Sequence, residues 1–210
     1  YRALGLEAFN SRSKDFDVGT VGAGAGALAA MQKGGLGSVS LKLENGYTVG
    51  ALVVVNPFGS VTTSGGKHFW AAPFEFENEF GGAGIDSSPG PFDLKHSSKN
   101  KAMKVHSDQI SNTTIAIVAT DAPLSKTQCY RMAVAAHDGM VRAIVPSHTL
   151  YDGDLVFALS TKKGEIDHET FRDIGVASAV CLSRAIARGV YEATTDEDDI
   201  LPTYKKTNCI

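Results

Sequence analysis

The stretch Gln109-Ile-Ser-Asn-Thr-Thr-Ile-Ala-Ile-Val-Ala-Thr-Asp-Ala-Pro123 marks the point where an irregular chain becomes a buried strand. Residues 57–109 before it are rich in Gly, Ser, Pro and Phe and show no sustained hydrophobic period. An unstructured segment of that length inside a compact domain is often functional. The run 114–119 is compact and apolar, as in a buried strand. By themselves, the hydroxyl residues at this junction favour an ordinary strand start.

Downstream of the junction, strands and helices alternate. Ser125 and Gln128 form the Ser-x-x-Gln pattern of a capping box, which predicts a helix start. This helix places Cys129, Met132, Ala133, Ala136 and Met140 on one face. Residues 155–159 read as another strand, and residues 170–188 as a nearly all-apolar helix.

Upstream, residues 38–43 alternate and residues 47–55 read as the return strand of a hairpin through Glu44-Asn-Gly46. We also expect a short helix over residues 3–9 and two helical turns over residues 27–33.

The order of hairpin, long loop, strand, helix, strand and helix predicts an α/β layered fold with a mixed sheet, formed by a single domain over residues 1–210. Two segments are expected to be solvated. They are a basic stretch, residues 95–104, and an acidic tail, residues 196–199.

Composition excludes several classes of function. The formal net charge is −3, with 43% hydrophobic and 20% charged residues, so the chain lacks a basic nucleic-acid footprint. No apolar run approaches the roughly 20 residues of a membrane span. The three cysteines, Cys129, Cys181 and Cys209, fit neither a disulfide framework nor a metal site. Cys129 and Cys181 are expected to be buried thiols in a reducing compartment, which favours a cytoplasmic location.

Other catalytic motifs are weak or missing. The glycines of 22–26 follow G-x-G-x-G rather than the dinucleotide fingerprint, and no phosphate-binding G-x-x-x-x-G-K-[ST] occurs. The histidines are scattered, so neither a cofactor nor a metal is expected. No G-x-S-x-G elbow is present. His137 beside Asp138 is expected on a solvated helix surface.

Five motifs lie along the chain in a fixed order and together span essentially residues 18–190. They are Val21–Gly26, Lys33–Gly37, Val49–Asn56, Asn112–Pro123 and Tyr151–Phe157. Their sequences and order resemble those of the self-cleaving β-peptidyl aminopeptidase and nylon-oligomer hydrolase family. The resemblance implies a layered α/β/β/α sandwich of the N-terminal-nucleophile type.

The resemblance implies a precursor that cuts itself between Asn112 and Thr113. Residues 1–112 would then belong to a large subunit and residues 113–210 would form a small one. The hydroxyl of Thr113 would attack the substrate amide, with its own freed α-amine as the base. An α-amine has a pKa of about 7.7–8.0, so part of it is neutral at cellular pH. Family members also carry a segment upstream of the region that matches this chain, and we expect it to be absent here.

The resemblance also implies four partners for Thr113. Asn56, at the end of an apolar strand, would be a rigid oxyanion donor, or else a strand-end cap. Lys33 would stabilise negative charge or tune the amine, or else be a solvated lysine at a helix end. Asp152 and Asp154 would point at the Thr113 amine and at Lys33, or else form an ordinary acidic turn.

The implied reaction is acyl transfer to Thr113 followed by hydrolysis. The Asn-Thr junction most resembles that of the family's nylon-oligomer hydrolases, so linear 6-aminohexanoate oligomers are the expected substrates. A β-peptidyl aminopeptidase is the alternative, and it needs a group that takes up the substrate amine. In the long loop, the only dense group of acidic residues that could take up this amine is Glu75, Glu77 and Glu79. More remote alternatives are an acetyl-transferring enzyme of arginine biosynthesis and a glycine-rich binding module. The expected assembly is a homo-oligomer of cleaved heterodimers, without nucleic-acid or membrane partners.

Overall fold

The computed structural model describes residues 2–90, 97–106 and 112–210. These residues form one four-stranded mixed sheet with the strand order β1-β2-β3-β4. The first two pairs are antiparallel, and β3 and β4 are parallel. The strands are β1 (Gly35–Lys42), β2 (Thr48–Val55), β3 (Ile115–Pro123) and β4 (Leu155–Lys162).

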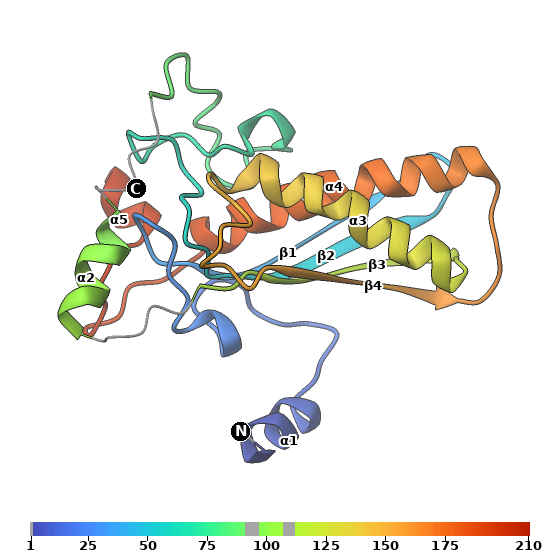
Figure 1. Cartoon of the computed structure of the whole chain (residues 1–210), viewed down its shortest axis with the longest axis horizontal. Coiled ribbons are helices and arrows are strands. Elements are labelled where there is room, and N and C mark those ends of the chain that lie inside the picture. Colours follow the sequence, from blue (N-terminus) through green and yellow to red (C-terminus); the bar gives the residue numbers. More distant parts are fainter. Residues whose placement is uncertain (1, 91–96, 107–111) are drawn as a thin grey trace.

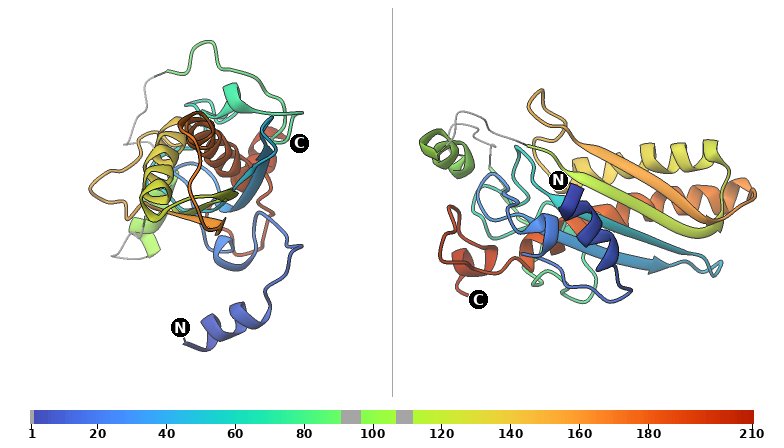
Figure 2. Two further views of the ribbon diagram at one scale, coloured as in Figure 1. Left: turned by 90° about the vertical axis from the view of Figure 1, so that its right-hand side faces the viewer. Right: turned by 90° about the horizontal axis from the view of Figure 1, so that it is seen from below.

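Two long helices, α3 (Lys126–Ala143) and α4 (His168–Tyr191), lie side by side on one face of the sheet (Figures 1 and 2). The expected capping box is present, because the Ser125 side chain accepts from Gln128 N–H and the Gln128 side chain accepts from Ser125 N–H. The parallel pair β3 and β4 is connected through α3, as a crossover requires.

Helix α4 is the centre of the core. It is long and apolar enough to cross a membrane, but 72% of its most apolar window is buried inside the protein. It packs against α3, β1 and β2. Its apolar composition is therefore explained by its contacts with both the sheet and α3.

Glycines allow α4 to approach β1 closely. A Cβ on Gly37 would lie 1.8 Å from the Ala185 carbonyl oxygen, and one on Gly35 would lie 2.2 Å from that of Gly189. Only a residue without a side chain fits such a contact between backbones. The Lys33–Gly37 motif therefore has a packing role in addition to any role in the site.

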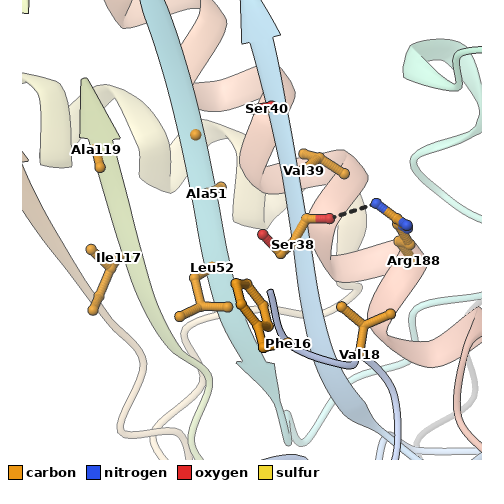
Figure 3. Close-up of a pocket in the computed structure, with 11 residues that line it drawn as sticks. Phe16, Val18, Ser38, Val39, Ser40, Ala51, Leu52, Ile117, Ala119 and Arg188 are labelled. Carbon is orange, nitrogen blue, oxygen red and sulfur yellow. Dashed lines mark hydrogen bonds between the residues drawn. The ribbon is translucent and has the colours of Figure 1, made fainter. Parts of the chain in front are cut away.

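The other face of the sheet carries apolar side chains that stay partly accessible. Phe157 and Leu159 on β4 are 60% and 42% exposed. A hollow on this face is lined by Leu52 and Ile117, with Phe16 and Val18 from the N-terminal segment beside them (Figure 3). The described residues thus supply one sheet and one helix layer of the expected sandwich, and none of them forms a second sheet.

The remaining elements are short. Helix α1 (Arg2–Asn10) has no buried residue and stands away from the sheet (Figure 1). The 3-10 turns η1 (Gly22–Gly24) and η2 (Ala72–Phe74) interrupt irregular segments. Helix α2 (Ser98–His106) and helix α5 (Tyr204–Asn208) lie on the same side of the molecule.

Two local expectations were wrong. Residues 27–33 do not form helical turns, because Leu28 and Lys33 pair as an isolated β-bridge and Gly34 packs against the Val55 carbonyl. The basic stretch 95–104 is not a solvated tail throughout. Residues 95 and 96 lie outside the described residues, and from residue 98 the chain forms α2.

The cysteines follow the expectation in part. Cys181 is fully buried in α4, and burial raises the pKa of its thiol to about 11. Cys129 is half-buried and Cys209 is exposed.

The glycine contact predicts a stability effect. Gly37→Ala should lower the free energy of unfolding by about 1–3 kcal/mol, because the added methyl group forces β1 and α4 apart. Gly26→Ala is the matched control, since a Cβ there meets nothing within 4 Å. Urea unfolding of the two variants measures the difference. Equal stability of both would contradict this packing role.

Candidate active site

The backbone around Thr113 is held from both sides. On one side, Thr113 N–H donates to the Asn56 carbonyl at the end of β2, at 2.9 Å. On the other side, Gly153 N–H donates to the Asn112 carbonyl at 3.0 Å, and Asn112 pairs with Asp152 in a parallel bridge. The junction is therefore a continuation of the sheet, in line with β3, and its position is set by backbone hydrogen bonds.

The Thr113 hydroxyl lies against the peptide bond that precedes it. Its Oγ1 donates to the Asn112 carbonyl oxygen at 2.5 Å. Because Gly153 N–H donates to the same oxygen, two donors polarise this carbonyl. A Cβ on Gly153 would lie 2.8 Å from Thr113 Oγ1, so a glycine is needed there for the hydroxyl to keep its place. A hydroxyl beside a doubly hydrogen-bonded carbonyl is the arrangement that an internal acyl shift requires.

Asp154 is a buried carboxylate next to this peptide bond. Its side chain is 1% exposed. One oxygen accepts from Thr114 N–H at 2.8 Å, and the other accepts from His148 N–H at 3.2 Å and lies 3.1 Å from His148 Nδ1. Asp154 is thus fixed one residue from Thr113.

Asp152 has a different set of partners. It accepts from Phe58 N–H at 2.9 Å, and from the backbone N–H and hydroxyl of Thr149 at 3.0 and 2.6 Å. These bonds join the segment after β2 to the turn before β4. Asp152 and Asp154 therefore both flank the junction. Their carboxylates bind neighbouring segments, unlike those of an ordinary exposed acidic turn.

Lys33 is buried, but its ammonium points to another partner. Its side chain is 3% exposed and forms an ion pair with Asp199. Burial raises the pKa of the Asp199 carboxyl, but hydrogen bonding to Lys33 and the Lys33 charge oppose this effect, and the pKa ends below its usual value. Asp199 belongs to the expected solvated acidic tail, so that expectation was wrong at this residue. No contact between the Lys33 ammonium and Thr113, Asp152 or Asp154 occurs in the described part of the chain.

Asn56 has an oriented side chain. Its Oδ1 accepts from Leu28 N–H at 3.1 Å and from Lys99 Nζ at 3.0 Å. Its backbone carbonyl holds Thr113 N–H. Asn56 therefore contacts the junction through its backbone, while its amide group is fixed by the neighbouring segment.

Lys99 is a site residue that sequence reasoning missed. It is 1% exposed, and its ammonium donates to the carbonyls of Leu28 and Pro57 at 2.8 and 3.1 Å besides the Asn56 amide. Burial lowers its pKa to about 8, against the opposing attraction of Asp152. In the sequence, Lys99 is one of several lysines in a polar stretch, and no local pattern distinguishes it.

The histidines His137 and His148 were also missed. His137 lies at the surface of α3 but is half-buried, and its Nδ1 lies 3.2 Å from His148 Nε2. These residues lie on α3 and in the loop before β4, and only the fold brings them together.

Two of the three carboxylates in the acidic group of the long loop are already engaged, and the third, Glu77, is exposed. Arg184 donates to both oxygens of Glu79, at 2.5 and 3.0 Å, and Glu75 accepts from the backbone N–H groups of Phe80 and Gly82. Within the described ranges, no group of three or more His, Cys, Asp or Glu side chains could hold a metal ion.

Comparison with known proteins places this arrangement in a family. Residues 2–199 match the model of peptidase family S58. The chain is 40% identical to an uncharacterized aminopeptidase of Mycobacterium leprae over 199 residues, which is 89% of this chain and 52% of that protein. It is 29% identical to the 6-aminohexanoate-oligomer endohydrolase of Paenarthrobacter ureafaciens, over 80% of this chain and 46% of that protein.

A solved structure shows the same fold. The L-aminopeptidase D-Ala-esterase/amidase of Ochrobactrum anthropi, described as a variant of the Ntn hydrolase fold, superposes with a TM-score of 0.62 at 21% identity. The match covers 94% of this chain and 52% of that one.

The chain belongs to peptidase family S58 and has the N-terminal-nucleophile hydrolase fold, as its motifs predicted. It spans about half the length of the curated relatives it matches.

The buried lysine yields a prediction about pH. Lys99 releases its proton in the folded state near pH 8, and in the unfolded state only near its usual pKa of 10.5. Between these values the unfolded state binds more protons, so the stability of the wild type should rise with pH. In Lys99→Met this rise should be missing, whereas the exposed control Lys101→Met should keep it. Unfolding by urea between pH 7.5 and 10 measures the slope, and equal slopes in all three proteins would contradict a buried ammonium at Lys99.

Proposed function

We propose that this chain is the core of a self-processing amide hydrolase in which Thr113 becomes the N-terminal nucleophile. One observation carries the proposal. The Thr113 hydroxyl and the Gly153 N–H converge on the Asn112 carbonyl, within the sheet that positions them. Family membership supports amide-bond chemistry at this place.

The proposed self-cleavage is an acyl shift followed by hydrolysis. Thr113 Oγ1 attacks the Asn112 carbonyl carbon while its proton passes to the amide nitrogen. The carbon–nitrogen bond then breaks, which leaves an ester at Oγ1 and a free α-amine on Thr113. Water hydrolyses the ester to give the Asn112 carboxylate and the free Thr113 hydroxyl. Gly153 N–H stabilises the negative charge that develops on the carbonyl oxygen.

In the cleaved enzyme, the Thr113 α-amine would take the hydroxyl proton as the hydroxyl attacks a substrate amide. Asp154 lies where it would stabilise the resulting ammonium, since it already binds the adjacent Thr114 N–H. Asn56 would be the oxyanion donor, and Lys99, which donates to its Oδ1, would hold its amide group in place. We retain Lys33 as a charge-stabilising candidate, although its ammonium is paired with Asp199 in the uncut chain.

For the substrate, the relatives favour an aminopeptidase acting on free-amine peptides. The aminopeptidase relative shares 40% identity with this chain, whereas the 6-aminohexanoate-oligomer endohydrolase shares 29%. The Asn112–Thr113 junction supports linear 6-aminohexanoate oligomers as the second candidate. Glu75 and Glu79 are already hydrogen-bonded, so an aminopeptidase would take up the substrate amine with another group.

We further propose a cytoplasmic homo-oligomer of cleaved heterodimers. The buried free thiol of Cys181 supports a reducing compartment, and size-exclusion chromatography with light scattering tests the assembly.

Cleavage is tested by mass spectrometry and N-terminal sequencing of the purified full-length protein. Wild type should yield a fragment that begins at Thr113, and Thr113→Ala should remain one chain without amidase activity. Gly153→Ala should slow cleavage at least about tenfold, because its methyl group displaces the hydroxyl. Gly175→Ala is the matched control, since its Cβ would make only an ordinary contact at 3.7 Å. A fragment that begins at another residue would refute the assignment.

The substrate is tested with two probes. We expect β-alanyl-p-nitroanilide to be hydrolysed with a kcat/KM at least about tenfold above that of an N-acetylated 6-aminohexanoate trimer, because a site that binds a free amine rejects an analogue without it. Faster turnover of the blocked trimer would favour the oligomer hydrolase.

A further inference from the structure

A chain of hydrogen-bonding groups leads from the cleavage junction to the outside of α3. It begins at Thr114 N–H, which donates to Asp154 Oδ1 at 2.8 Å. Asp154 Oδ2 lies 3.1 Å from His148 Nδ1, and His148 Nε2 lies 3.2 Å from His137 Nδ1. The Asp154 side chain is 1% exposed and the His148 side chain is 34% exposed, whereas His137 is half-buried, so His148 is the more exposed of the two rings.

The chemistry of these atoms fixes where the protons are. An ionised carboxylate only accepts hydrogen bonds, so His148 Nδ1 must carry the hydrogen that faces Asp154. In neutral His148 the Nε2 atom is then an acceptor, and His137 Nδ1–H must be its donor. When a proton binds His137 Nε2, His137 Nδ1 can therefore give its hydrogen to His148 Nε2. His148 Nδ1 can then give its hydrogen to Asp154 Oδ2.

Backbone geometry holds His148 in this place. His148 has a φ of 54°, in the left-handed region that non-glycine residues rarely adopt. In this conformation its own N–H also donates to Asp154 Oδ2. Backbone strain of this kind persists only where the surroundings impose it, and it often accompanies a functional site.

We propose that His148 and His137 are positioning residues that orient the Asp154 carboxylate and relay protons between it and solvent. This inference rests on the proposed function of Thr113, because the relay serves the α-amine that cleavage creates. When that amine takes the proton of the Thr113 hydroxyl, Asp154 balances the charge. With the tautomers set by these hydrogen bonds, the two histidines pass a proton inward to Asp154 without opening the site, and both rings change tautomer before another proton can follow.

The electrostatics of His137 agree with a coupled pair. Burial lowers the pKa of His137, and the neighbouring His148 lowers it further. Asp154 and Asp138 act in the opposite direction. These are the charged groups that bear on the pair from α3, from the loop and from the start of β4. The pKa of His137 therefore responds to the charges of both His148 and Asp154.

The first test requires no substrate. In the full-length protein labelled with ¹⁵N-histidine, NMR should show neutral His148 protonated at Nδ1. In His148→Asn the titration midpoint of His137 should move up, because a like charge is removed. In Asp154→Asn it should move down. Unchanged midpoints in both variants, or a His148 protonated at Nε2, would overturn the proposal.

The second test uses hydrolysis of β-alanyl-p-nitroanilide, or of the N-acetylated 6-aminohexanoate trimer if only that is cut. His148→Asn keeps a donor near Asp154 but ends the relay. It should lower kcat roughly tenfold with KM unchanged and alter the acidic limb of the pH profile. The exposed His168→Asn is the control and should match the wild type. Wild-type kcat in His148→Asn would overturn the relay. If the wild type cuts neither probe, the proposed function fails, while the NMR result still decides the inference on the histidines.

Discussion

The backbone of residues 112–114 is bound on both sides, and the rest of the site depends on this constraint. β2 contributes the Asn56 carbonyl, and the segment before β4 contributes Gly153 N–H. Further along, Leu155 N–H donates to the Thr114 carbonyl at 3.1 Å. Because these bonds continue the ladders of β3, the reacting peptide bond has the rigidity of a sheet rather than of a loop.

That rigidity depends in turn on the packing of β3 and α4. Ala116 and Val118 are fully buried on the helix-covered face, and α4 approaches β1 through Gly37 and Gly189. A layer packed this closely allows little displacement. The position of the Thr113 hydroxyl beside the Asn112 carbonyl therefore depends also on the close contact between β1 and α4.

Buried polar groups surround the junction, and each needs partners to offset its lost hydration. Lys99 obtains four oxygen acceptors, Lys33 obtains Asp199, and Asp154 obtains two backbone donors and a histidine. Such a network loses stability when one member is removed, because the others stay buried without partners. It also concentrates ionisable groups at one end of the sheet, where the proposed chemistry needs them.

Local sequence patterns determined the secondary structure and pointed to the junction. Alternation over 38–43, the return strand 47–55 after the Glu44–Gly46 turn, the capping box at Ser125 and the apolar composition of 170–188 are local features, so each could be predicted from nearby residues. The family motifs added Thr113, Lys33, Asn56, Asp152 and Asp154. Only the tertiary structure decided their partners. Lys99 with Asn56, Lys33 with Asp199, and His137 with His148 lie on segments that no local period connects. These pairs form because the fold buries both charges or rings at one place, where desolvation forces each group to find a partner.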